Sequence, residues 1–337
     1  MSYTSNTLNK NIDYLRMRRN RKSDWIRRLV CENHLTVNDL ILPVFIVSGT
    51  NVIEPIHSMP GVNRMSIDNT IEIAKKASDL GIPAIAIFPN IEIELRDDTG
   101  SHSLRSDNIL NKAISAIKKA VPNIGIITDV ALDPFTSHGH DGILYKDEII
   151  NDKTVEIISR VAVIQADAGA DIIAPSEMMD GRVQAIRRAL DKHGHTNVGI
   201  MSYTAKFNSA LYAPYREAIS TQQLLKGNKA TYYIDSANIS EAIREAAIDM
   251  QEGADMFIVK PGLPYLDICN QIKKTFGLPT FAYQVSGEYA MIRAASLNGW
   301  IDEKKVLMET LLAFKRSGCD GIFTYFALEA AHILLHP

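Results

Sequence analysis

Short apolar segments alternate with segments of helical period along most of the chain, and this alternation constrains the fold more than any other feature. Eight apolar segments are predicted as strands, at residues 40–46, 83–88, 125–130, 172–176, 199–203, 256–260, 280–285 and 321–326. Helices are predicted at residues 66–80, 107–120, 152–168, 180–192, 239–252, 264–275, 303–317 and 327–335. Eight strand–helix pairs predict an α/β fold of the TIM (β/α)₈ barrel type, with an open doubly wound sheet as the alternative.

The composition is that of an ordinary globular protein, with 46% hydrophobic and 22% charged residues among 337. No apolar stretch reaches the roughly 18 residues of a membrane span, and the N-terminus has no apolar leader segment. The net charge of −3 gives no reason to expect nucleic acid as a partner. Three scattered cysteines, Cys31, Cys269 and Cys319, argue against a disulfide framework. We therefore expect a cytoplasmic protein that binds neither membranes nor nucleic acid.

The first residues of the chain differ from the rest because they are polar and rich in basic side chains. Arginine and lysine recur between Arg16 and Arg28. We predict an N-terminal arm at residues 1–36, which serves oligomerisation, and a catalytic barrel at residues 37–337. From composition alone, a solvated tail and an arm docked on a neighbouring subunit are both open.

Lys206 and Lys260 each end a predicted strand and precede a segment rich in proline, glycine and aromatic residues. Chemistry in a TIM barrel takes place at the C-terminal ends of the strands, so the two lysines are expected at one mouth. Burial and a neighbouring ammonium both lower the pKa of a lysine and make it nucleophilic near neutral pH. The pair therefore indicates Schiff-base chemistry on a ketone, and a structural ion pair is the alternative for either lysine alone.

The loop at residues 129–142, after the third predicted strand, concentrates polar side chains. They are Asp129, Asp133, His138, His140 and Asp141. Two histidines two residues apart, beside carboxylates, are able to ligate a divalent metal. A polar loop of turn residues produces the same spacing without a metal, so the loop alone does not decide between the two.

The connection between Lys206 and the helix predicted from residue 239 is about thirty residues long, which is unusual in a barrel. We predict an active-site lid there, at about residues 207–238. Arg216 and Lys229 in this lid are suited to hold a substrate carboxylate, although surface solvation is the alternative. Tyr283, Ser286 and Tyr325 place hydroxyl groups near other strand ends.

Long motifs spread over nearly the whole chain resemble the δ-aminolevulinate dehydratase (porphobilinogen synthase) family. They are SMPGVNR (58–64), DVALDPFTSHGHDG (129–142), APSEMMDGR (174–182), MSYTAKF (201–207), YAPYR (212–216), EGADMFIVKPGLPYLDI (252–268), YQVSGEYAMI (283–292) and IFTYFA (322–327). The resemblance implies a TIM-barrel lyase that condenses two molecules of 5-aminolevulinate into porphobilinogen with loss of two waters, in tetrapyrrole synthesis.

The resemblance also implies roles for individual residues. Lys206 and Lys260 match the two Schiff-base lysines of the family. The carboxylate of the substrate on Lys260 is expected to meet the hydroxyls of Ser286 and Tyr325. The carboxylate of the other substrate is expected to meet Arg216 and Lys229. Further residues that match pocket positions are Asp129, Ser176 and Tyr203 as catalytic residues, and Asp133 and Asp141 near the substrate.

The metal ligands depart from the zinc-using pattern of the family. Where zinc-using members carry three cysteines, this chain has Ala131, Asp133 and Asp141. Hard carboxylates favour Mg²⁺ or no active-site metal, so no catalytic zinc is expected. Relatives with such a loop resemble members with an allosteric Mg²⁺ at a subunit interface, and Glu245 matches its carboxylate ligand.

Two other positions depart from the family pattern, since Glu177 replaces a more usual aspartate and Tyr233 a usual glutamine. The resemblance further implies a homo-octamer in which the N-terminal arm wraps a neighbouring barrel.

Three rival functions stay open. They are a class I Schiff-base aldolase with a single lysine, a metal-dependent hydrolase built on His138 and His140, and a barrel that binds without catalysis.

Overall fold

The structure is a computed structural model that describes residues 15–336. Contacts within the chain divide it into two units, one ending at His34 and the other beginning at Leu35. The first fourteen residues of the predicted arm lie outside the described residues. The described part of the small unit holds a short 3-10 helix, Met17–Arg21, and α1, Asp24–Leu29, and neither buries a residue.

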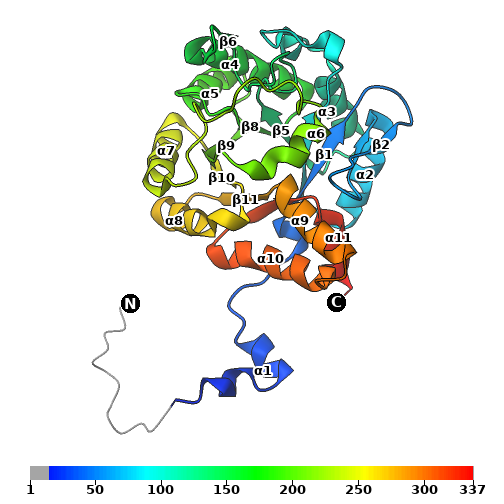
Figure 1. Ribbon diagram of the computed structural model, residues 1–337, viewed down its shortest axis with the longest axis vertical. Coiled ribbons are helices and arrows are strands. Elements are labelled where there is room, and N and C mark those ends of the chain that lie inside the picture. The colour runs from blue at the N-terminus through cyan, green and yellow to red at the C-terminus, as the bar shows by residue number, and fades with distance from the viewer. Residues whose placement is uncertain (1–14, 337) are drawn as a thin grey trace. The chain divides into compact units, whose positions relative to one another are not determined.

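Eight parallel strands of the larger unit close into a barrel (Figure 1). In order around the barrel they are β1 (Leu40–Ile46), β4 (Ala84–Pro89), β5 (Gly125–Val130), β8 (Ile172–Pro175), β9 (Gly199–Lys206), β10 (Met256–Lys260), β11 (Thr280–Gln284) and β12 (Gly321–Thr324). The ring closes where β12 pairs with β1, with Leu40 opposite Ile322. The predicted TIM barrel is therefore confirmed, and the open sheet is excluded.

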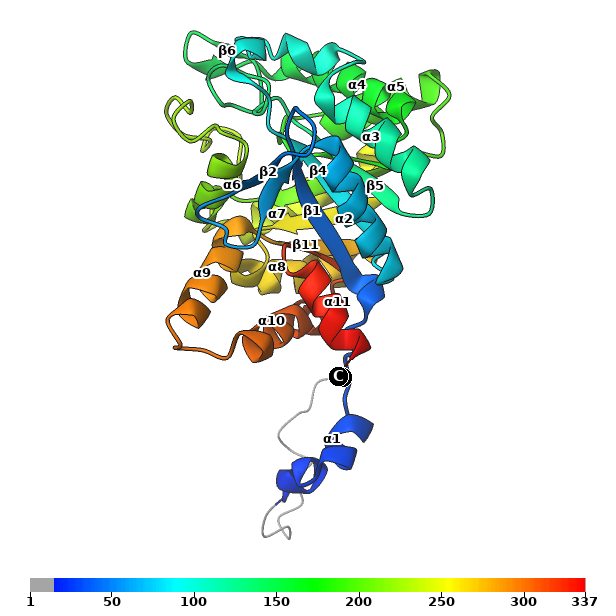
Figure 2. The same ribbon diagram turned by 90° about the vertical axis from the view of Figure 1, so that its right-hand side faces the viewer.

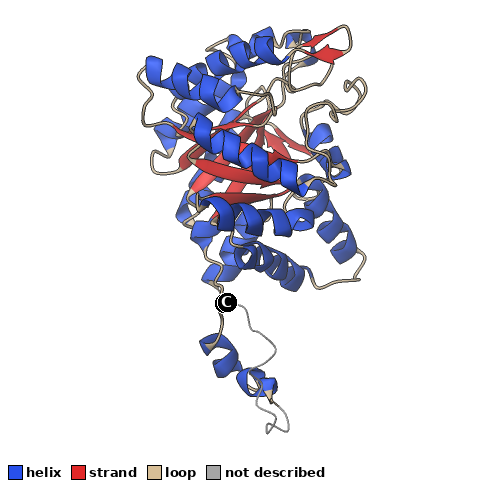
Figure 3. Cartoon of the chain, turned by 90° about the vertical axis from the view of Figure 1, so that its left-hand side faces the viewer, coloured by secondary structure: helices blue, strands red, loops and turns tan. Residues whose placement is uncertain are grey.

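Helices surround the strands, as the view coloured by secondary structure shows (Figure 3). The eight that were predicted are α2 (Ile67–Asp79), α3 (Ile109–Ala120), α4 (Asn151–Ala168), α5 (Arg182–Lys192), α7 (Ile239–Glu252), α8 (Leu266–Phe276), α10 (Glu303–Ser317) and α11 (Ala327–Leu335). The first turn of α3 is capped by the Asn108 side chain, which accepts from the backbone N–H of Asn111. No helix within residues 15–336 is long and apolar enough to cross a membrane.

Several strands and α-helices of the larger unit were not predicted. They are the strands β2 (Ile53–Pro55), β3 (Asn63–Met65), β6 (Leu144–Tyr145) and β7 (Glu148–Ile149), and the helices α6 (Ala213–Ala218) and α9 (Ser286–Leu297). Strands of two or three residues are too short to show an alternating pattern. β3 pairs with the end of β1 and with β2, which is labelled beside β1 in Figure 2. α9 was missed because it begins two residues after β11 ends, with Val285 as its N-cap and no turn residue between them.

The strands are buried because both their faces are covered, one by the helices and one by the barrel interior. Every residue of β1 is buried, and so are all but the first residue of β9. The C-terminal ends of these strands carry polar groups into the barrel mouth, among them Asp129 on β5, Lys206 on β9 and Lys260 on β10. The barrel therefore gathers side chains that are far apart in the sequence.

Candidate active site

Lys206 and Lys260 are directly opposite each other on the neighbouring strands β9 and β10. Both are buried, with 4% and 5% of their surface exposed. They line one pocket, as predicted from their positions at strand ends. The other residues that line it are Asp133, Ser176, Tyr212, Tyr215, Arg216, Lys229 and Tyr233.

The amine of Lys260 lies among tyrosine rings rather than carboxylates. The distances from its Nζ to the ring centroids are 4.6 Å for Tyr283, 5.0 Å for Tyr203, 5.1 Å for Tyr215 and 5.6 Å for Tyr212. Burial, and then the positive charge of Lys206, lowers the pKa of Lys260 to about 7. About half of this amine is then neutral and nucleophilic at neutral pH.

The amine of Lys206 has a different environment, because it contacts oxygen atoms directly. Its Nζ donates to the backbone carbonyl of Ser176 at 2.5 Å and to Oδ1 of Asp141 at 3.4 Å. It also lies 4.4 Å from the ring centroid of Tyr233 and 5.9 Å from that of Tyr203. The two lysines of the pocket are therefore chemically unequal.

Asp141 makes most of the polar contacts between the loop at residues 129–142 and the predicted lid, residues 207–238. Lys229 places its Nζ 2.6 Å from Oδ2 of Asp141 and 3.4 Å from Oδ2 of Asp133. Tyr232 and Tyr233 both donate their hydroxyls to Asp141, each at 2.9 Å. Burial alone would raise the pKa of Asp141, but the charges of Lys229 and Lys206 hold it well below its usual range. Burial raises the pKa of Asp133.

The two histidines of the loop do not form a metal centre. Nδ1 of His140 lies 2.9 Å from the hydroxyl of Tyr232, and its Nε2 lies 2.6 Å from the carbonyl of Lys226. Nε2 of His138 lies 3.2 Å from the carbonyl of Asp98. In the described range 15–336, no three His, Cys, Asp or Glu side chains are grouped to hold a metal. His140 instead binds Tyr232 and Lys226 of the lid. The contacts of the two histidines therefore do not support a metal site in this loop.

Two arginines that were not predicted as site residues bind backbone carbonyl groups in the first half of the lid. Arg64 donates to the carbonyls of Glu217 and Ala218 at the end of α6, both at 2.6 Å. Buried Arg96 donates to the carbonyls of Ile219 and Ser220. These arginines bind carbonyl groups at the C-terminal end of α6 and in the turn that follows it. Arg64 lies in the motif SMPGVNR, whereas no sequence signal distinguishes Arg96.

Ser286 and Tyr325 lie outside the set of residues that line the lysine pocket. Ser286 begins α9, where its hydroxyl accepts from the backbone N–H of Tyr215 at 2.9 Å. The Tyr325 hydroxyl lies 3.2 Å from that of Tyr283, whose ring contacts Lys260. Both residues are buried and are connected to the pocket by one intervening tyrosine each.

Asp129 is a half-buried residue whose carboxyl group is able to exchange a proton near neutral pH. Its Oδ1 has no hydrogen-bond partner, and burial raises its pKa to about 6, while the charges of Lys206 and Lys260 oppose that rise. Ser176, the carbonyl partner of Lys206, interacts with this carboxyl group through its side chain. A carboxyl group with a pKa close to the working pH is suited to general acid–base catalysis.

Arg182 connects the strand ends to a second pocket. Its guanidinium, 1% exposed, lies 2.8 Å from Glu245 and 3.0 Å from Asp249. Its Nε is 3.9 Å from Glu177, whose two carboxyl oxygens are buried without a hydrogen-bond partner. Burial raises the pKa of Glu177 to about 8, despite the opposing charge of Arg182. Glu177, which departs from the family pattern, is therefore mostly protonated at neutral pH.

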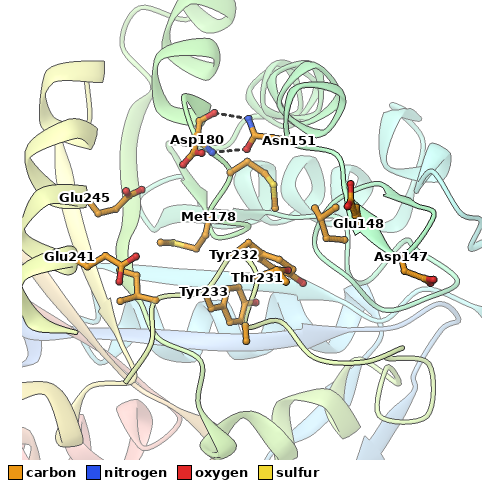
Figure 4. Close-up of a pocket in the computed structure, with 14 residues that line it drawn as sticks. Asp147, Glu148, Asn151, Met178, Asp180, Thr231, Tyr232, Tyr233, Glu241 and Glu245 are labelled. Atoms are coloured by element: carbon orange, nitrogen blue, oxygen red, sulfur yellow. Dashed lines mark hydrogen bonds between the residues drawn. The ribbon is translucent and has the colours of Figure 1, made fainter. Parts of the chain in front are cut away.

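The second pocket is acidic and has a volume of about 500 Å³. Figure 4 shows Glu241 and Glu245 of α7 on one side, and Asp147 and Glu148 of the β6–β7 hairpin on the other. Asp180 adds a further carboxylate to its lining. Residues 230–234 of the lid also line this pocket, so the lid separates it from the lysine pocket.

Comparison with known proteins identifies close relatives along the whole length. The family profile of delta-aminolevulinic acid dehydratase matches residues 14–333. The chain is 55% identical to the delta-aminolevulinic acid dehydratase of Bradyrhizobium diazoefficiens, covering 95% of this chain and 91% of the relative. It is 47% identical to the enzyme of Rhodobacter capsulatus, over 95% and 96% of the two chains. The crystal structure of the Toxoplasma gondii ME49 enzyme, solved with porphobilinogen, superposes with a TM-score of 0.94 at 43% identity, covering 96% and 92%.

Proposed function

The chain belongs to the delta-aminolevulinic acid dehydratase family and is a lyase that forms porphobilinogen from 5-aminolevulinate, and we propose that Lys206 and Lys260 each hold one substrate as a Schiff base. The observation that carries this proposal is the pair of buried lysines side by side in one pocket. An aldolase that uses a single Schiff-base lysine would not need a second buried amine in the same pocket.

The reaction joins two substrate molecules and releases two waters. The neutral amine of Lys260 adds to the keto carbon of one substrate, and loss of water leaves a cationic imine. An imine acidifies the neighbouring carbon, so one substrate becomes an enamine that attacks the imine carbon of the other. The attacked carbon then releases its lysine as a free amine, and the amino group of that substrate adds to the remaining imine carbon, which forms the C–N bond and displaces the second lysine. The two waters lost are therefore those of the two imine formations. Asp129, with its raised pKa, is suited to move protons in these steps.

The two substrates are proposed to bind through different groups. Arg216 and Lys229 would hold the carboxylate of the substrate on Lys206, since both line the lysine pocket. Ser286 and Tyr325 would hold the other carboxylate, which requires the hydroxyl of Ser286 to turn from its lid contacts. Asp133 and Asp141 would position Lys229, and Tyr203 would pack between the two lysines.

Borohydride trapping tests the proposed function. Reduction in the presence of 5-aminolevulinate is expected to label Lys260, together with formation of porphobilinogen by the unreduced enzyme. Because the pKa of Lys260 is about 7, its neutral fraction rises with pH, so the initial labelling rate should rise about tenfold from pH 6 to pH 8. Peptide mapping measures the adduct. Absence of an adduct on both lysines, or a rate that falls with rising pH, would contradict the proposal.

We also propose an allosteric Mg²⁺ at Glu245 and no catalytic zinc. Mg²⁺ keeps several waters and is bound by one or two carboxylates, which suits an acidic pocket without a dense ligand cluster. Glu245 and Glu241 would hold it, and it would supply positive charge beside the lid. The loop does not fit catalytic zinc, because it has no thiolate and Lys229 already binds Asp133 and Asp141.

The metal proposal predicts a specific loss of magnesium response. In Glu245→Gln, the Mg²⁺ concentration that gives half of the maximal stimulation should rise at least about tenfold, because the neutral amide is a weaker ligand. The matched control is Glu252→Gln, which makes the same change at the C-terminal end of the same helix, outside the acidic pocket. Its response to Mg²⁺ should match that of the wild type. If zinc-selective chelation abolishes the activity and only Zn²⁺ restores it, the proposal that the enzyme has no catalytic zinc is contradicted.

The assembly and location of the protein are proposals as well. We propose a homo-octamer in which the N-terminal arm, residues 1–36, contacts a neighbouring subunit. Trp25 and Leu29 of α1 support this, because both are exposed apolar side chains. The mass of the assembly in solution, with and without the arm, tests this proposal. The free thiols of Cys31, Cys269 and Cys319 fit a reducing cytoplasm.

A further inference from the structure

Tyr233 brings both an aromatic ring and a hydroxyl from the lid into the lysine pocket. The backbone beside it is paired with β9, since the N–H of Ile234 donates to the carbonyl of Lys206 at 3.1 Å. The carbonyl of Ile234 accepts from the N–H of Asn208 at 2.8 Å. The position of the Tyr233 ring is thus tied to the backbone of the lysine that it covers.

The ring of Tyr233 lies within cation–π range of Lys206. Its centroid is 4.4 Å from Nζ, and Tyr203, the other ring near this nitrogen, is 5.9 Å away. Both Lys206 and Tyr233 are buried, at 4% and 6% exposure, and desolvation strengthens a cation–π contact. Most of the aromatic stabilisation available to Lys206 therefore comes from this lid residue.

Schiff-base formation changes which contacts the nitrogen of Lys206 is able to make. As an ammonium it has three N–H groups and donates to the carbonyl of Ser176 and to Asp141. A protonated imine keeps the positive charge but only one N–H group, so at least one of these hydrogen bonds is lost. Attraction to the face of a ring requires charge and no N–H group, and it survives the change.

We propose that Tyr233 is a catalytic residue that stabilises the protonated imine on Lys206 through its ring, an inference that rests on the proposed function. The hydroxyl has a separate task. It donates to Oδ1 of Asp141 at 2.9 Å, the same atom that accepts from Lys206. Burial raises the pKa of Tyr233 well above its usual value, so the phenol stays a donor and anchors the ring.

The test is borohydride trapping with 4-oxopentanoate, which is the substrate without its amino group and forms a Schiff base without ring closure. Tyr233→Leu removes the ring and is expected to lower the adduct on Lys206 about 10- to 30-fold. Tyr233→Phe keeps the ring and is expected to stay within about threefold of the wild type. Peptide mass mapping quantifies both lysines, and the adduct on Lys260 should be unchanged in both variants.

Tyr232 provides the matched control, because it lies on the same lid and its hydroxyl also donates to Asp141. Tyr232→Leu should leave the Lys206 adduct within about threefold of the wild type. The inference is overturned if Tyr233→Leu forms the adduct as the wild type does, or if Tyr233→Phe or Tyr232→Leu loses as much as Tyr233→Leu. Wild-type protein without an adduct on either lysine would overturn the proposed function itself, so the two failures are distinguishable.

Discussion

Replacing Lys206 with alanine is expected to lower kcat/KM for porphobilinogen formation at least about 10³-fold. The proposed mechanism needs an imine on this lysine, and the other Schiff-base lysine of the pocket, Lys260, is occupied by the second substrate. Lys229 cannot substitute for it, because its ammonium is held by Asp141 and Asp133. The measurement is steady-state turnover, together with single-turnover trapping of the adduct on Lys260.

The same variant separates the proposed mechanism from that of a class I aldolase. An aldolase with one Schiff-base lysine would keep C–C bond formation in Lys206→Ala and release an open-chain product. The two-lysine mechanism predicts that Lys260 still forms its adduct but that no coupled product appears. Lys226→Ala is the control, because that lysine is an exposed lid residue outside the pocket. Coupled product formed by Lys206→Ala at the wild-type rate would rule out a role for the second imine.

The barrel was predictable because its strands and helices carry strong local signals. The strands at residues 40–46, 125–130 and 256–260 were predicted with the bounds that the structure shows. Parallel strands buried on both faces form continuous apolar runs, which are easy to separate from amphipathic helices. The position of Lys206 and Lys260 in one pocket followed from the rule that barrel chemistry takes place at the C-terminal strand ends.

The environments of the two lysines were not predictable from the sequence. Both end an apolar strand, yet Lys260 is surrounded by tyrosine rings while Lys206 contacts Asp141 and the carbonyl of Ser176. These contacts come from the lid, from the loop at residues 129–142 and from other strand ends, so no local pattern encodes them. Burial without a carboxylate partner lowers the pKa of Lys260 to about 7, which makes it the amine that we expect to react first.

The two histidines of the loop show that spacing in the sequence does not by itself establish what a side chain binds. Two histidines beside aspartates are typical of a metal site, but His140 uses both ring nitrogens to bind the lid. Its partners, Tyr232 and the carbonyl of Lys226, lie more than eighty residues further along the chain. The resemblance to a family indicated lysine chemistry at this mouth, whereas spacing alone left the metal interpretation open.

Replacing Arg182 with methionine is expected to lower the free energy of unfolding by about 3–5 kcal/mol. The guanidinium is 1% exposed, and its removal leaves the carboxylate of Asp249, also 1% exposed, without its cation. Glu245 loses its ion pair too, but it is partly exposed and is able to turn to solvent. Urea unfolding measures the change. Arg188→Met is the matched control, because it is an exposed position on the same helix, and it should change the free energy by about 0.5 kcal/mol or less.

A second substitution tests whether the loss comes from the uncompensated charge. Adding Asp249→Asn to Arg182→Met removes the buried carboxylate, so the double variant should recover at least about 1 kcal/mol relative to Arg182→Met alone. Ser202, whose hydroxyl donates to Asp249 at 2.7 Å, is able to satisfy the new amide oxygen. A double variant less stable than Arg182→Met would mean that lost packing, and not the isolated carboxylate, causes the destabilisation. Arg182 would then stabilise the fold mainly by filling the space between α5 and α7, and not through its ion pairs.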